Sequence, residues 1–473
     1  MAEYSVPEKL SGIPFLQFQK YAVIGAGLSG QSAARLLVGF GKTVELYDDS
    51  ADPAAPAFEP LRNLGIALKF GGDQTLSPDT QAVVTSPGIA EEHRLHTAAR
   101  AAGIPVRGEL ELGFVCAPGA RVAAITGTNG KTTVTMLMQK LLADGGLDAV
   151  AAGNIGMPMA QVALERGPAS DALAKTAFAV EVSSFQLETI EFFAPEVAII
   201  LNVTPDHLDR HGSMDHYAAL KGRVTENQTP GQVLVINQDD PYCLAIGARS
   251  RARVRRFSLE RPVDDGAWLD GDLIMLKSPS AKPHVLMPMS DLKLIGLHNV
   301  ANAMAAACAA EAMGIGRKRI AQTLSEFAAA PHRLELVATI GGVAYVNDSK
   351  GTNLGAVERA LECFDGPIHL IAGGRDKASP FETLVARMQG RVKAAYLIGE
   401  AAAPMQRAWS GAIECVQCGT MENALEEASR RAAEGETILL SPGCASFDQF
   451  KSYAQRGEVF RDWVRRKQSA MAS

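Results

Sequence analysis

The sequence lacks the features of membrane, exported and nucleic-acid-binding proteins. No apolar run approaches the roughly 20 residues that span a bilayer, which argues against membrane insertion. The amino-terminal stretch has neither a basic segment nor an apolar one, so no export signal is expected. The net charge of −6 argues against broad binding to nucleic acid. We therefore expect a cytoplasmic protein without nucleic-acid partners. We also expect a monomer, although this expectation does not follow from these features.

Cysteine is also scarce, with 7 residues scattered through 473, which fits a reducing compartment. Cys415 and Cys418 form a Cys-x-x-Cys pair, but no second such pair accompanies them, so they are only a weak indication of a metal site. The run from Arg251 to Arg256 is the main basic cluster, and we predict a solvated edge strand or loop there. The length suggests about three domains with cores of their own.

The segment from Val122 to Thr133 is the most informative part of the chain. Val122 to Ile125 predicts a buried parallel strand, and an apolar face with Val134 and Leu137 predicts a helix after Thr133. The loop between them contains the residues of a phosphate cradle: Gly127, Thr128, Asn129, Gly130, Lys131 and Thr132. Backbone N–H groups and a lysine bind phosphates in such loops, and the hydroxyl after the lysine can ligate Mg²⁺. The pattern predicts a nucleotide triphosphate site.

A second glycine-rich loop lies near the amino terminus. A strand from Tyr21 to Ile24 enters Gly25-Ala26-Gly27-Leu28-Ser29-Gly30, and a second strand ends at Asp48. This is a dinucleotide fingerprint, but its glycines accept any nucleotide diphosphate. It therefore leaves open whether the ligand is a nicotinamide cofactor or another pyrophosphate.

Polar residues recur where apolar strands end, which is where open α/β sheets bind ligands. In the first two thirds of the chain they are Ser86 to Gly88, Asn154, Glu181, and Asn202 to His211. His207, Asp209 and His211 could also form a zinc cluster, although a phosphate loop favours Mg²⁺. Lys221 lies on a predicted helix, where a surface lysine is the simplest interpretation. Asn299 and Asn302 share one face of an alanine-rich helix.

The last third repeats the strand–loop–helix pattern. Four apolar strands end in the polar or glycine loops that begin at Asn347, Gly373, Gly399 and Ser441. The sequence thus predicts an α/β protein with three domains: a Rossmann-like domain over residues 1–116, a P-loop domain with a parallel sheet over 117–331, and a second Rossmann-like domain over 332–473.

Together these motifs resemble the Mur ligases, ATP-dependent amide-forming enzymes of bacterial cell-wall synthesis. The resemblance covers nearly the whole chain and rests on seven stretches: Gly127 to Thr132, Glu181 to Glu188, Asp206 to Arg210, His298 to Asn302, Pro331 to Arg333, Asn347 to Asn353, and Ser441 to Gln449. It implies a ligase that adds D-glutamate to UDP-N-acetylmuramoyl-L-alanine through an acyl phosphate in peptidoglycan precursor synthesis. Because the matching residues are spread over three domains, the resemblance also implies closure on the ligands.

The resemblance assigns roles residue by residue. In the central domain, Gly127 to Thr133 would bind ATP, Lys131 would hold its phosphates, and Asn299 and Asn302 would contact adenine. Two Mg²⁺ ions would be held by Thr132, Glu181, His207 and a Lys221 carbamylated by CO₂. The nucleotide-sugar substrate would contact Leu28, Ser29, Gly30, Asp48, Ser86, Gly88, Asn154 and Ser183. In the last domain, Arg333, Asp348 and Lys350 would bind ATP, with Lys350 also catalytic, and Thr352, Lys377, Ser446 and Tyr453 would bind D-glutamate.

Three alternatives remain. A ligase of the same type could take L-glutamate or another amino acid. A nicotinamide-dependent dehydrogenase would rest on the fingerprint alone and would leave Lys131, Glu181 and His207 without a role. A non-catalytic, nucleotide-gated scaffold would not need the complete set of metal and phosphate residues.

Overall fold

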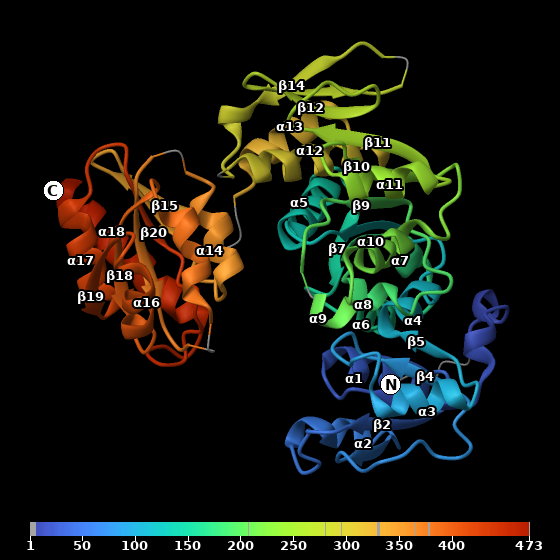
Figure 1. Ribbon diagram of the computed structural model, residues 1–473. Helices are drawn as coiled ribbons and strands as arrows, with labels where there is room; N and C mark the ends of the chain where they lie inside the picture. Colours follow the sequence, from blue (N-terminus) through green and yellow to red (C-terminus); the bar gives the residue numbers. More distant parts are fainter. Residues whose placement is uncertain are drawn as a thin grey trace. The chain divides into compact units, whose positions relative to one another are not determined.

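The computed structural model describes residues 6–206, 208–279, 281–294, 296–328, 332–364, 366–376 and 379–472. The chain divides into two compact units, one of residues 1–291 and 301–325 and the other of 292–300 and 326–473. The first unit contains two sheets and the second contains one (Figure 1). All three sheets are mainly parallel, so the predicted α/β class is confirmed.

The first sheet has the strand order β3-β2-β1-β4-β5, and its strand pairs are all parallel. Neighbours β1 and β4 mark the point where the strand order reverses, which is where such sheets bind ligands. The strands are β1 (Lys20–Ile24), β2 (Thr43–Asp48), β3 (Ala67–Phe70), β4 (Ala82–Thr85) and β5 (Val106–Gly108).

The central sheet has the order β14-β13-β12-β11-β10-β9-β6-β8-β7 and is parallel from β7 to β12. Its middle strands β6, β9 and β8 are almost wholly apolar and buried, as expected for strands covered on both faces. The strands are β6 (Arg121–Thr126), β7 (Asp148–Gly153), β8 (Thr176–Glu181), β9 (Val197–Ile200), β10 (Val233–Asn237), β11 (Arg253–Ser258), β12 (Gly266–Asp270), β13 (Leu273–Lys277) and β14 (His284–Pro288).

The third sheet has the order β15-β16-β20-β17-β18-β19, with β15 antiparallel at one edge. All four strands predicted from the sequence are present, and the structure adds β15 and β19. The strands are β15 (Glu335–Ile340), β16 (Val343–Asn347), β17 (Ile368–Gly373), β18 (Val392–Ile398), β19 (Glu414–Gly419) and β20 (Thr437–Leu440).

Helices connect the parallel strands and bury their apolar faces on the sheets. On α5, Val134, Leu137, Met138 and Leu141 are all buried, as the sequence predicted. The helices are α1 (Leu28–Gly39), α2 (Glu59–Arg62), α3 (Arg94–Ala101), α4 (Glu109–Val115), α5 (Lys131–Asp144), α6 (Met159–Arg166), α7 (Asp171–Ala174), α8 (Ser184–Leu187), α9 (Leu208–His211), α10 (Met214–Gly222), α11 (Pro241–Arg249), α12 (Leu297–Ala312), α13 (Arg317–Glu326), α14 (Leu354–Leu361), α15 (Val385–Met388), α16 (Ala402–Trp409), α17 (Met421–Arg431) and α18 (Tyr453–Ala472).

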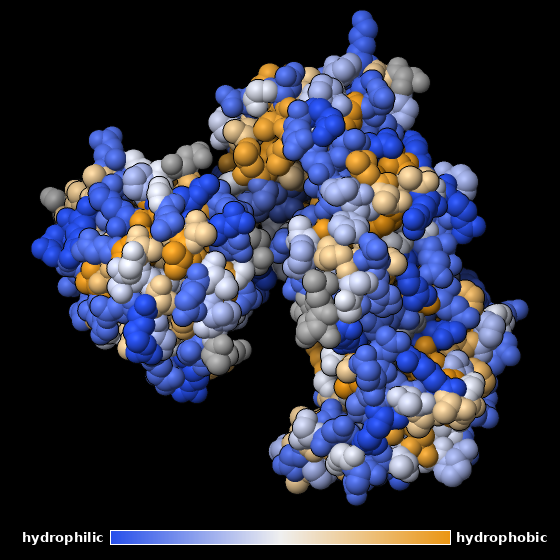
Figure 2. Space-filling model, viewed as in Figure 1, coloured by the Kyte–Doolittle hydropathy of each residue, from blue (hydrophilic) through white to orange (hydrophobic). Residues whose placement is uncertain are grey.

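The visible face in Figure 2 is mostly hydrophilic, with apolar residues in separate patches. Among the described residues, no helix is both long enough and apolar enough to cross a bilayer.

The basic run was predicted wrongly. Strand β11 lies inside the central sheet, between β10 and β12. Arg255 is 1% exposed, and its guanidinium pairs with Asp265 at 2.8 Å and Glu311 at 2.7 Å. Two carboxylates outside the basic run thus make a buried arginine tolerable, and the run itself did not reveal them.

Candidate functional site

The phosphate loop joins β6 to α5 and is braced from β9. The N–H of Asn129 donates to Asn202 Oδ1 at 2.8 Å, and Asn202 Nδ2 donates to the Asn129 carbonyl at 3.2 Å. Thr128 Oγ1 donates to the Thr204 carbonyl at 3.1 Å. These bonds fix the loop so that the amino end of α5 is presented at the carboxyl edge of the sheet, the position from which such loops bind phosphate.

Gly130 immediately precedes α5, and its backbone requires glycine. Its φ is +84°, a conformation that residues with a side chain rarely adopt. A Cβ there would also lie 2.5 Å from Asn302 Oδ1, so the loop and the buried Asn302 of α12 are in close contact. The structure thus brings Asn302 to the phosphate loop, whereas Asn299 belongs to the second unit.

Two lysines meet at one backbone oxygen of the loop. Lys131 Nζ donates to the carbonyls of Gly127 and Thr128, each at 2.8 Å. Lys221 Nζ, from α10, also donates to the Gly127 carbonyl at 2.8 Å and lies 4.5 Å from the centre of the Tyr217 ring. Lys221 is 1% exposed, so the interpretation as a surface lysine was wrong. Burial, and then the neighbouring charge of Lys131, lower the pKa of Lys221 to about 7.

Glu181 ends β8, the strand beside the phosphate loop, and is 2% exposed. Its Oε1 accepts a hydrogen bond from Asn154 Nδ2 at 2.9 Å. Its Oε2 is buried and has no hydrogen-bond partner among the described residues. A buried carboxylate oxygen that accepts no hydrogen bond is suited to bind a metal ion. Thr132, at the start of α5, provides the hydroxyl that was predicted to bind the ion together with Glu181. The donor set therefore fits Mg²⁺.

The nucleotide fingerprint lies at the carboxyl edge of the first sheet. Asp48 Oδ2 accepts the N–H of Ala26 at 2.8 Å, and Ser86 Oγ donates to the Gly25 carbonyl at 3.2 Å. Burial raises the pKa of Asp48, but the backbone amides of Ala26, Ser50 and Ala51 outweigh it and lower that pKa. Leu28, 61% exposed, begins α1 beside Ser29 and the buried Gly30. This edge of the sheet thus offers an anionic acceptor, a glycine loop and an exposed apolar side chain.

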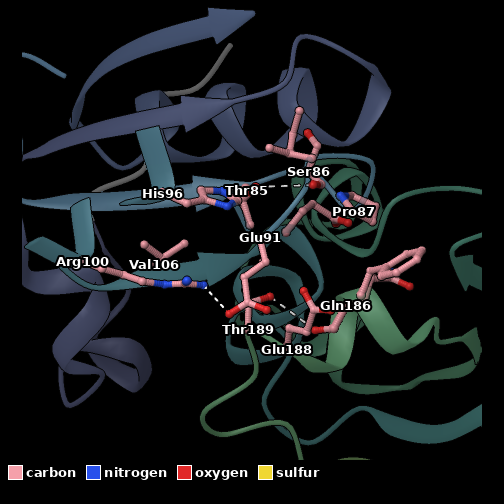
Figure 3. A pocket seen from close by; sticks show the side chains of 14 residues that line it. Thr85, Ser86, Pro87, Glu91, His96, Arg100, Val106, Gln186, Glu188 and Thr189 are labelled. Carbon is pink, nitrogen blue, oxygen red and sulfur yellow. Dashed lines mark hydrogen bonds and ion pairs between the residues drawn. The ribbon is translucent and has the colours of Figure 1, made fainter. Parts of the chain in front are cut away.

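A pocket lies next to this edge (Figure 3). The loop after β4 contributes Ser86 and Pro87, and the region of α8 contributes Gln186 and Glu188. Gln186 also forms a capping box with Ser183 at the start of α8. The side chain of Ser183, a predicted substrate residue, is thus hydrogen-bonded within that helix end. Gly88 is exposed in the loop after β4. The pocket therefore joins the first sheet to the segment that follows Glu181.

In the second unit, the predicted residues after residue 332 that the structure describes lie at the carboxyl edge of the third sheet. Asp348, after β16, accepts a hydrogen bond from Ser441 Oγ at 2.8 Å. Lys350 Nζ lies 5.3 Å from the centre of the Tyr453 ring, which is 36% exposed. Thr352 and Arg333 are half-buried and Ser446 is buried. The predicted His207 and Lys377 lie outside the described residues.

The sequence analysis did not assign three residues that hold these loops. They are Asn202, Tyr217 and Arg456. Arg456 is buried and donates to the Ser349 carbonyl at 2.9 Å and the Cys444 carbonyl at 3.1 Å. Only Asn202 had a visible signal, because it is the first polar residue after β9.

His211, one of the candidate zinc ligands, is instead packed between rings. It stacks on Phe185 and on Tyr217, with ring centres 5.2 and 5.0 Å away, and it bonds to Ser184 Oγ at 3.0 Å. No group of metal-binding side chains of the zinc type occurs in the part of the chain that the structure describes.

Replacement of Gly130 by alanine tests the fit of the loop. We expect Gly130→Ala to weaken ATP binding by at least about tenfold, or about 1.4 kcal/mol, because the new methyl would displace Asn302. Isothermal titration calorimetry with a non-hydrolysable ATP analogue measures this change.

Gly146→Ala is the matched control. Gly146 has φ +86°, follows the other end of α5, and has open space around its Cβ position. It carries the same backbone strain without the collision, so its ATP affinity should equal that of the unmodified chain. Equal losses in both variants would show that backbone strain alone, and not the contact with Asn302, matters.

Comparison with known proteins covers all three sheets. Residues 19–108 match the MurD-like amino-terminal domain of Mur ligases, residues 125–310 the Mur ligase middle domain, and residues 332–444 the glutamate ligase domain of Mur ligases.

Relatives similar over almost their full length include the UDP-N-acetylmuramoylalanine–D-glutamate ligases of Koribacter versatilis and Acidobacterium capsulatum. The first is 42% identical over 95% of this chain and 97% of its own length, and the second is 41% identical over 97% and 98%. The solved structure of the MurF ligase of Thermotoga maritima in complex with ADP has the same fold, with TM-score 0.55, 15% identity, and coverage of 90% of this chain and 96% of its own. The chain belongs to the Mur ligase family.

Proposed function

We propose that this chain is an ATP-dependent ligase that joins D-glutamate to UDP-N-acetylmuramoyl-L-alanine, forming ADP and phosphate in peptidoglycan precursor synthesis. The similarity to ligases of that name, at 41 and 42% identity over nearly the whole chain, is the observation that carries the proposal. The site geometry supports it, because a phosphate loop, two lysines and a buried carboxylate converge at one edge of the central sheet.

The chemistry explains why such a site is needed. A carboxylate is a poor acylating agent because its leaving group would be oxide. Transfer of the γ-phosphoryl group from ATP to the substrate carboxylate gives an acyl phosphate, whose leaving group is phosphate. The amine of D-glutamate then attacks the acyl carbon, the C–O bond to phosphate breaks, and the ammonium proton is released. The first step gathers several anionic oxygens, so fixed positive charge must surround them.

The central residues supply that charge. Lys131 would turn from the loop carbonyls to the β- and γ-phosphates, while the N–H groups at the start of α5 bind phosphate oxygens. Thr132 and Glu181 would hold Mg²⁺, which when bound neutralises phosphate charge. Asn154 holds the Glu181 carboxylate through its hydrogen bond to Oε1. A second ion, with His207 as a further ligand, is part of the proposal.

Lys221 is proposed to carry a carbamate. CO₂ reacts only with the unprotonated amine, and burial makes that form accessible by lowering the pKa of Lys221 to about 7. The adduct exchanges a positive group for an oxygen anion, which would relieve the repulsion from Lys131 and provide a ligand for Mg²⁺.

The outer groups bind the remaining substrate parts. Leu28 to Gly30 and Asp48 would take the uridine diphosphate, and Ser86, Gly88, Asn154 and Ser183 the sugar and peptide. Arg333, Asp348, Lys350 and Asn299 would contact ATP together with Asn302, with Lys350 also catalytic. Thr352, Lys377, Ser446 and Tyr453 would bind the two carboxylates of D-glutamate. With these assignments, residues 1–116 form the nucleotide-sugar domain, 117–331 the ATP domain and 332–473 the amino-acid domain. We propose separately that the enzyme is cytoplasmic and monomeric.

The carbamate gives a pH-dependent signal. With ¹³C-bicarbonate, we expect a carbamate resonance that grows between about pH 6 and about pH 8, because the neutral fraction of Lys221 rises through its pKa. Lys221→Met should lack the resonance. A bare amine throughout this range, together with full activity of Lys221→Ala, would remove the carbamate from the mechanism.

The activity itself is tested by phosphate release with UDP-N-acetylmuramoyl-L-alanine, ATP and a panel of D- and L-amino acids. We expect release with D-glutamate, and a fall of at least about a hundredfold in Lys131→Ala, because a fixed charge on the transferred group is lost. Release with L-glutamate instead would favour the alternative ligase. Reduction of NAD by the chain, without phosphate release, would favour a dehydrogenase.

A further inference from the structure

Helix α6 is held at its amino end by a glutamate from another helix. Glu109, the first residue of α4, is 1% exposed, and its Oε1 accepts the N–H of Ala160 at 2.6 Å. The first N–H groups of a helix have no partner within the helix, so this carboxylate completes α6 from outside. One turn later on α4, a Cβ on Gly113 would lie 2.6 Å from the Ala160 nitrogen. The backbones of α4 and α6 therefore touch (Figure 1).

The turn before α6 leads directly to Glu181. It runs from Gly153 to Pro158 and is closed by the N–H of Gly153, which donates to the Met157 carbonyl at 3.1 Å. At the far side of the turn, Asn154 contacts Glu181 twice. Its N–H donates to the Glu181 carbonyl at 2.9 Å, and its side chain donates to Glu181 Oε1 at 2.9 Å. The orientation of the Glu181 carboxylate thus depends on where this turn lies.

We propose that Glu109 is a positioning residue for the reaction: by anchoring the amino end of α6, it fixes the turn that carries Asn154 and so holds the Glu181 carboxylate in place. This inference rests on the proposed function, in which Glu181 holds Mg²⁺. Glu109 contacts no substrate and acts only through α6 and Asn154.

The chemistry of Glu109 is unusual for a helix cap. Burial raises the pKa of Glu109 to about 7, and its Oε2 has no hydrogen-bond partner among the described residues. Serine or asparagine, the common caps, would satisfy one N–H without burying an acid. The Glu109 carboxylate comes from α4 and therefore links α6 to another helix. A capping residue within α6 itself could not make that link. On α6, Gln161 is bound in turn by Ser32 of the fingerprint helix α1, at 3.0 Å.

The same helix provides a matched control. Glu111 is 3% exposed and accepts the N–H groups of Phe192 at 2.6 Å and Phe193 at 3.2 Å. These residues precede β9, so they lie toward the edge of the sheet opposite the phosphate loop. Glu109 and Glu111 are thus both buried backbone acceptors on α4, but of the two only Glu109 bonds to the helix whose preceding turn contacts Glu181.

The test compares Glu109→Ala and Glu111→Ala in the full chain. Three quantities are measured: the unfolding temperature, Mn²⁺ affinity by electron paramagnetic resonance in the presence of ADP, and hydrogen exchange of residues 153–160. We expect both variants to lose stability, because each leaves buried backbone N–H groups without an acceptor. Only Glu109→Ala should bind Mn²⁺ about tenfold more weakly, which is the smallest effect usually seen when a metal ligand loses a supporting hydrogen bond. The backbone amides of residues 153–160 should also exchange hydrogen faster in that variant alone.

An unchanged Mn²⁺ affinity in Glu109→Ala, or equal weakening in both variants, would overturn the inference. If Glu109→Ala does not fold, Glu109→Asp decides by the same criteria, since it withdraws the carboxylate by about 1.5 Å, one C–C bond, and keeps its charge. Glu181→Gln separates the two hypotheses. If that variant binds Mn²⁺ as tightly as the unmodified chain, the proposed metal role of Glu181 is wrong, whatever Glu109 does.

Discussion

Two lysine amines share one carbonyl oxygen, and this crowding underlies the site. Lys131 and Lys221 both lie 2.8 Å from the oxygen of Gly127. Two ammonium groups so close repel each other, and burial of Lys221 adds the cost of desolvation. The arrangement is relieved by an anion, by loss of a proton, or by conversion of one amine to an anionic group. This crowding supports the proposed binding of phosphate and the proposed carbamate on Lys221.

The framework around this point is built from side chains that bind backbone. Asn202 holds the phosphate loop, Arg456 holds the loops of the third sheet, and Glu109 holds α6. Each of these side chains takes the place of water as the hydrogen-bond partner of buried backbone amides or carbonyls, so its removal would leave those groups without a partner. Such contacts set the positions of the residues that we propose to bind the ligands.

The sequence predicted the parts whose signals are local. The strand–glycine loop–lysine pattern located the phosphate loop, and the polar residues after strands located Glu181 and Asn154 at a carboxyl edge. The family resemblance selected Lys221, which a helix pattern alone would have left on the surface. The environment of Arg255 could not be predicted, because its partners Asp265 and Glu311 meet it only after β11 enters the sheet. The bond between Asn154 and Glu181, and the cap from Glu109, likewise depend on contacts between distant segments.

Transfer of oxygen between substrate and phosphate tests the central claim most directly, because carboxylate activation leaves an isotopic record. The carboxylate of UDP-N-acetylmuramoyl-L-alanine is labelled with ¹⁸O, and the phosphate released during turnover with ATP and D-glutamate is analysed by mass spectrometry. If the phosphoryl group is transferred to the substrate carboxylate, the phosphate carries one ¹⁸O atom per amide bond formed. Unlabelled phosphate accompanying normal product would contradict the account.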